Sequence, residues 1–286
     1  MTVLQRPETN RNSARLHWLT RLCFTPLAGF TAVFGPLLML FPGATADYWA
    51  WEIRPAMSAF WVGASYTFGA IAIGTMLVNG ERRASLIPIL STWPFAAVML
   101  AATLIHEDRF FTGEASYYVW FVIYLALPFA LPAMYWLSSR GEGWGSPGGP
   151  LLPEPARIML AGAGVVAAVL GLLLVLAPGA LDQSWPWRLT PLMSRIVGGW
   201  LLFIATGALA PLWQPHYASY RYYLPAVAVW FLLLLAGAII HNGDLDFDRP
   251  ATWLFLVALV LTVGGTGGLF LLMERRLRSS GIDAGQ

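Results

Sequence analysis

Eight apolar stretches of 18 to 23 residues, separated by short polar segments, constrain the fold of this 286-residue chain more than any other feature. Each is long enough to cross a hydrocarbon core of about 30 Å as an α-helix. A membrane barrel strand would alternate polar and apolar residues, which these stretches do not. We therefore predict an all-α integral membrane protein with eight transmembrane helices: Leu22–Phe41, Ala56–Val78, Ser85–Ile105, Tyr117–Leu137, Ile158–Ala177, Ile196–Trp213, Tyr222–Ile240 and Ala251–Met273.

The charge content agrees with a surface that mostly faces lipid. Only 11% of the residues are charged, whereas a soluble domain carries about 25%. A net charge of +2 without a basic stripe excludes a nucleic-acid partner. We expect the lipid bilayer to be the main partner, with other membrane subunits or a second copy of the chain as further candidates.

A repeated phrase divides the chain into two halves. Residues 42–63 align without a gap on residues 178–199, and nine of the 22 positions are identical. We predict a first four-helix repeat at 22–140 and a second at 157–278. A cytoplasmic N-terminal segment (1–21), a Gly/Pro-rich cytoplasmic linker (141–156) and a C-terminal tail (279–286) complete the chain. An even number of spans makes the two repeats parallel, so we expect a pseudo-two-fold axis along the membrane normal.

The distribution of arginine predicts the orientation. All 17 basic residues are Arg, a usage that we associate with GC-rich bacterial genomes. Twelve of them fall on the side that holds both termini. This bias places both termini in the cytoplasm of a bacterial cytoplasmic (inner) membrane. The outer side holds the other five: Arg54, Arg109, Arg188, Arg195 and Arg249.

The repeated phrase carries two tryptophans in each half, Trp49 and Trp51 in the first and Trp185 and Trp187 in the second. The favoured interpretation is an interfacial loop, because indole rings accumulate at headgroup depth. The alternatives are a pair of aromatic side chains over an outer ligand pocket between the units, and a protein–protein contact. Arg195 is a further candidate ligand residue, since the first half has Ala59 at this position.

Two histidines, His106 and His241, end the third and seventh spans at matching depth. Imidazole is a good ligand for haem iron, copper or zinc, so the pair could hold haem or a metal. The favoured interpretation is simpler: a His at a helix C-terminus interacts well with the last carbonyl groups.

Three aspartates, Asp244, Asp246 and Asp248, alternate after the seventh span and are candidates for a cation site. The glycine and later glutamate of the EF-hand loop are missing. A solvated acidic loop is the favoured interpretation.

Three functional hypotheses stay open. The first is a non-enzymatic membrane protein that binds a lipid or lipophilic ligand or serves as an accessory subunit. The second is a haem- or metal-binding redox protein that uses His106 and His241. The third is a small-molecule carrier, which is disfavoured because no Asp, Glu, Lys or Arg lies in the middle of any span.

The orientation can be tested with reporter fusions. We expect fusions after Arg83 and at the C-terminus to report the cytoplasm and a fusion after Asp108 to report the outside, because of the Arg bias. The reversed pattern would contradict the predicted orientation.

Overall fold

The structure, a computed structural model, describes residues 15–139 and 150–279. Within these ranges it holds nine α-helices, of which eight are long and apolar enough to cross a membrane. The all-α class and eight helices of membrane-spanning length and hydropathy are thereby confirmed. The helices are α2 (Trp18–Leu40), α3 (Thr45–Tyr48), α4 (Ala56–Asn79), α5 (Leu86–Ile105), α6 (Ala115–Ser139), α7 (Glu154–Leu176), α8 (Pro191–Leu209), α9 (Tyr223–Ile240) and α10 (Pro250–Ser279).

Two helices depart most from the predicted spans. Helix α8 begins at Pro191, before the predicted start at Ile196, because the Thr190 side chain accepts a hydrogen bond from the Met193 N–H and caps the helix. Proline at the first helical position lacks only an N–H that would have no partner there. Helix α10 continues past Met273, and its last turn carries basic residues that interact well with the helix C-terminus.

Parts of four predicted segments lie outside the described residues. They are residues 1–14 of the N-terminal segment, residue 140 of the first repeat, 141–149 of the linker and 280–286 of the tail.

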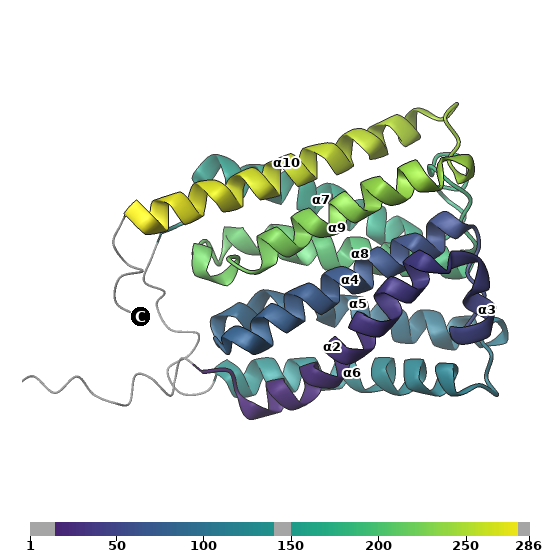
Figure 1. Ribbon diagram of the computed structural model, residues 1–286, viewed down its shortest axis with the longest axis horizontal. Helices are drawn as coiled ribbons and strands as arrows, with labels where there is room; N and C mark the ends of the chain where they lie inside the picture. The colour runs from purple at the N-terminus through teal and green to yellow at the C-terminus, as the bar shows by residue number, and fades with distance from the viewer. Residues whose placement is uncertain (1–14, 140–149, 280–286) are drawn as a thin grey trace, which may run out of the picture.

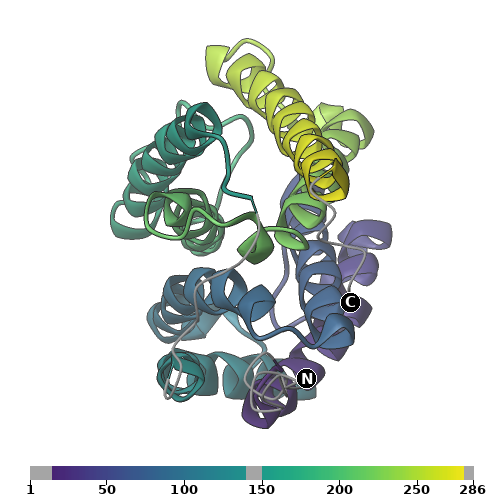
Figure 2. The ribbon, with the colours of Figure 1, turned by 90° about the vertical axis from the view of Figure 1, so that its left-hand side faces the viewer.

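The helices pack in neighbouring pairs. Helix α2 lies against α4 and α5 against α6 in the first half of the chain, and α7 lies against α8 and α9 against α10 in the second. The halves meet where α4 packs against α9 and α5 against α8. Viewed along the helices, the first four spans, purple to teal, and the last four, teal-green to yellow, occupy different sides of the bundle (Figure 2).

Glycines allow the closest helix approach in the second half. A Cβ atom added to Gly171 of α7 would lie 2.9 Å from the carbonyl oxygen of Gly198 in α8, and one added to Gly198 would lie 2.8 Å from the Gly171 carbonyl oxygen. Backbones can approach this closely only where no side chain separates them. The first half has a similar approach between Gly35 and Gly63.

Aromatic rings fill the contact between the halves. Trp200 of α8 packs on Phe95 of α5 with ring centroids 4.2 Å apart, and Trp230 of α9 stacks on Phe68 of α4 at 4.8 Å. Such ring pairs add specific geometry to the area that they bury.

The bundle has two polar ends. Helix α2 begins and α10 ends at the same end, on the left in Figure 1. There Arg221 forms a two-pronged ion pair with Glu274 of α10, at 2.9 and 3.1 Å, which ties α10 to the loop before α9. We call the opposite end, with the loops at 41–55, 106–114, 177–190 and 241–249, the distal end.

The close approach of α7 and α8 gives a first structural test. We expect Gly171→Val to lower the free energy of unfolding by about 1–3 kcal/mol, because the new methyl groups must push the helices apart. The matched control is Gly162→Val in the same helix, where an added Cβ meets nothing within 4 Å. The measurement is unfolding in mixed micelles with increasing SDS, and equal stability of the two variants would contradict the packing.

Candidate functional site at the distal end

The first tryptophan pair lies inside the bundle. Trp49 and Trp51 are each only 2% exposed, and their rings contact each other edge to face. Both pack on Trp120 of α6, with ring centroids 5.6 and 4.8 Å away. The loop that carries them is fixed by the Phe111 N–H, which donates to the Ala50 carbonyl oxygen at 2.9 Å.

The second pair makes a contact that joins the halves. Trp187 is 1% exposed and packs on Phe255 of α10 in its own half. Its ring also contacts Trp61 of α4, and its Nε1–H donates to the Ser58 hydroxyl at 3.0 Å. Trp185, 9% exposed, packs edge to face on Trp187. All four tryptophans are therefore enclosed by protein, and the second pair connects the 177–190 loop to α4.

His106 lies against the other half of the chain. Its Nε2 is 2.6 Å from the Arg195 guanidinium nitrogen Nη1. Burial lowers the pKa of the imidazole, and the positive charge of Arg195 lowers it further. A neutral imidazole accepts through one nitrogen, so Nε2 faces the Arg195 donor with its lone pair. That lone pair is occupied by a cationic donor, which makes it a poor place for a metal ion.

His241 has different surroundings. Its ring packs edge to face on Phe60 of α4, and its buried Nε2 has no hydrogen-bond partner. Within residues 15–139 and 150–279, no three His, Cys, Asp or Glu side chains come together as a metal site. The two histidines thus follow the ends of α5 and α9 but contact different kinds of residue.

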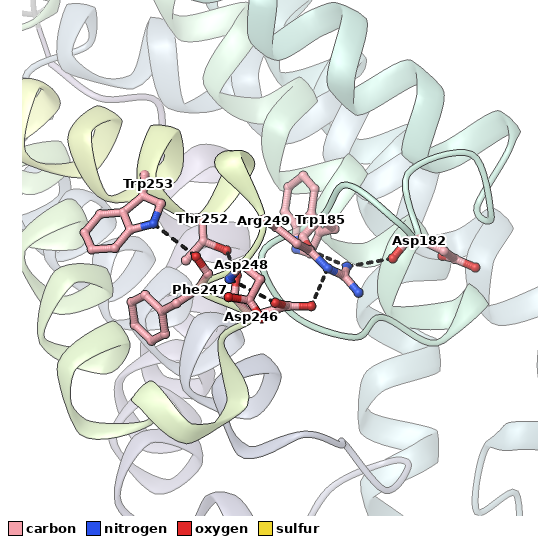
Figure 3. A network of polar contacts seen from close by, with 8 residues as sticks. All are labelled: Asp182, Trp185, Asp246, Phe247, Asp248, Arg249, Thr252 and Trp253. Carbon is pink, nitrogen blue, oxygen red and sulfur yellow. Dashed lines mark hydrogen bonds and ion pairs between the residues drawn. The ribbon is translucent and has the colours of Figure 1, made fainter.

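The three aspartates that follow the seventh span make different contacts. Asp244 accepts a hydrogen bond from the Met57 N–H at the start of α4, in the other half, at 2.8 Å. Asp246 pairs with Arg249 at 2.7 Å and also accepts from the Asp248 N–H (Figure 3). The carboxylates of Asp244 and Asp246 therefore hold protein groups on different elements, and Asp248 contributes its backbone N–H to this turn.

Arg249 organises the loops around this turn. Its Nη1 donates to the carbonyl oxygens of Asp182 and Trp185, both at 2.8 Å, while its Nε bonds Asp246 (Figure 3). One side chain thereby links the 177–190 and 241–249 loops. The Asp246 N–H reinforces this link by donating to the Pro186 carbonyl oxygen.

Between the halves, the distal end is hollowed. Two hollows, of about 590 and 500 Å³, share Arg54 and Thr190 in their linings. We call the two together the seam groove. The larger is lined by Pro42, Gly43, Ile53, Arg54, Pro55, Ala56, Arg188, Thr190 and Asp244. The smaller is lined by Trp51, Glu52, Arg54, His106, Asp108, Arg109, Phe111, Thr190, Pro191 and Leu192.

The seam groove includes only part of the residue set that the sequence suggested. Trp51, His106 and Asp244 line it, and Arg195 borders it through its contact with His106. Trp187 and His241 are not among its lining residues. Arg54 and Arg188 were not predicted as site residues, although their positions within the repeated phrase are a signal that could have found them.

Comparisons with protein-family models, with curated proteins and with solved structures gave no match for this chain.

The His106–Arg195 contact can be tested by NMR titration. We expect the His106 midpoint to lie below about 6.5, the ordinary pKa of histidine, and to rise in Arg195→Gln, because one lowering charge is removed. His106→Gln identifies the signal, and Arg276→Gln at the far end of the bundle is the control. A midpoint that does not move in Arg195→Gln would contradict the contact.

The lowered pKa of His106 also makes the stability of the folded protein depend on pH. Because the pKa of His106 is lower in the folded than in the unfolded state, the unfolded chain binds this proton more tightly. The contribution of His106 to stability therefore falls as the pH drops below about 6.5.

Proposed function

We propose that this protein is a non-enzymatic bacterial inner-membrane protein that binds an amphiphilic ligand, a lipid or another lipophilic molecule, in the seam groove. The observation that carries the proposal is the groove: a hollow between the halves at the ends of membrane-spanning helices. Ligand sites are concave, mostly apolar and provided with a few polar groups, and an interface between repeats is a natural place for one.

The lining of the groove supports an amphiphile. Pro42, Ile53 and Leu192 give it apolar walls, whereas Arg54 and Thr190 provide polar groups where the two hollows join. Because these residues lie at or just beyond the ends of the spanning helices, they fall near the depth of lipid headgroups. A ligand with a polar head and an apolar chain matches such a boundary.

The proposal includes an origin by duplication, with two parallel four-helix units related by a pseudo-two-fold axis. Equivalent contacts support it, since α4 packs on α9 as α8 packs on α5. The two copies of the repeated phrase are also held in place by similar backbone hydrogen bonds. Ala50 and Pro186, at matching positions, each accept a backbone N–H from the next distal loop of their own half. In such a molecule the seam groove lies at the repeat interface.

The proposal also places both termini in the cytoplasm and the seam groove on the outer side of the membrane. The excess of Arg at the opposite end supports this orientation.

Filling the groove tests the proposal. Gly43 lines the larger hollow, and a Cβ there meets nothing within 4 Å, so the side chain of Gly43→Trp starts in open space and should occupy the hollow. We expect this variant to retain fewer bound lipids, counted by native mass spectrometry after release from nanodiscs that hold equal amounts of phosphatidylcholine and phosphatidylglycerol.

The matched control is Gly179→Trp, at the equivalent position of the second half. An added Cβ there makes only an ordinary contact, 3.6 Å from Asp182, and Gly179 does not line the groove. If Gly43→Trp retains as many lipids as Gly179→Trp and the unmodified protein, the proposed function is wrong.

A further inference from the structure

The carboxylates around the seam groove are already engaged. Glu52 pairs with Arg54 at 2.6 Å, and Asp108 pairs with its neighbour Arg109 at 3.2 Å. Asp244 accepts the Met57 N–H, where the positive end of α4 also favours a negative charge. Glu52 and Asp108 are thereby neutralised, whereas Asp244 keeps its negative charge in the lining of the larger hollow, because the Met57 N–H is a neutral donor.

Two arginines of the second half have no carboxylate partner among the residues that the structure describes. Arg188 is exposed, lines the larger hollow and forms no hydrogen bond or ion pair with the residues that the structure describes. In the described part of the chain, Arg195 bonds only neutral groups, the imidazole of His106 and, at 3.4 Å, the Pro191 carbonyl oxygen. His106 thus holds the Arg195 guanidinium at the edge of the groove without cancelling its charge.

The start of α8 adds to this positive field. Thr190, Pro191 and Leu192 line the smaller hollow and form the N-terminus of the helix. A helix N-terminus carries a partial positive charge that favours anions. On the second-half side, Arg188 and the start of α8 therefore line the groove, and Arg195 lies next to the lining residue His106.

We propose that the seam groove selects an anionic amphiphile and holds its oxyanion, a phosphate or carboxylate group, with Arg188 and Arg195. The inference depends on the proposed function, because it names the chemistry of the ligand in the same groove. A zwitterionic headgroup is a poorer ligand, since its ammonium group would lie near two guanidinium groups, against which Asp244 offers only one negative charge. His106 is a positioning residue in this arrangement, because it acts through Arg195.

The test measures which lipid the protein retains. From nanodiscs with equal amounts of phosphatidylglycerol and phosphatidylcholine, we expect the unmodified protein to retain phosphatidylglycerol in excess. Arg188→Gln and Arg195→Gln should each reduce this preference about tenfold, the typical loss of one charge-assisted hydrogen bond. Arg276→Gln, an exposed arginine of α10 at the other end, is the control and should keep the preference.

Folding of every variant is checked by size-exclusion chromatography. The variant His106→Ala tests whether His106 positions Arg195. We expect this variant to keep phosphatidylglycerol but to lose part of the preference, because Arg195 is no longer held in place. An unchanged preference in both Arg188→Gln and Arg195→Gln would overturn the inference, as would an equal loss in Arg276→Gln.

Two further outcomes separate the explanations. If Gly43→Trp expels lipid while both arginine variants keep their preference, the groove binds lipid without selecting charge, so the inference fails and the proposed function stands. If lipid-free protein in detergent binds inorganic phosphate as tightly as it binds phosphatidylglycerol, the site recognises a free anion, and the assignment to an amphiphile is overturned.

Discussion

The hydrogen bond from Trp187 Nε1 to the Ser58 hydroxyl joins the two halves at the end of the molecule where the groove lies. Both groups are buried, so each would be costly to leave without a partner. One residue before Ser58, the Met57 N–H bonds Asp244 from the second half. The start of α4 is therefore held by two different loops of the other half, and the wall of the seam groove that α4 provides is fixed in place.

The charges of the groove follow from this junction. Asp244 is held by α4, Glu52 and Asp108 pair with neighbouring arginines, and among the described residues neither Arg188 nor Arg195 pairs with a carboxylate. Two guanidinium groups against the one carboxylate of Asp244 are tolerated here because they lie at the end of the bundle, not in the hydrocarbon core. The membrane environment thus explains why polar chemistry is confined to the ends of the chain's helices.

Hydropathy was sufficient to predict the eight spans, because crossing a bilayer requires a fixed length of apolar residues. The repeated phrase was sufficient to draw attention to the distal loops. Which helices and side chains become neighbours could not be predicted from the local pattern of hydrophobic residues. Trp51 packs within its own half while Trp187, at the matching position, bonds the other half, and His106 meets Arg195 whereas His241 meets Phe60. These differences depend on helix neighbours that lie far away in the sequence.

A double-mutant cycle between Trp187→Phe and Ser58→Ala tests most directly whether the halves are joined as described. The free energy of unfolding is measured in mixed micelles for the unmodified protein, both single variants and the double variant. We expect a coupling energy of about 1 kcal/mol, because either substitution alone leaves the other buried group without its partner. Strictly additive effects, with coupling below about 0.3 kcal/mol, would contradict the account.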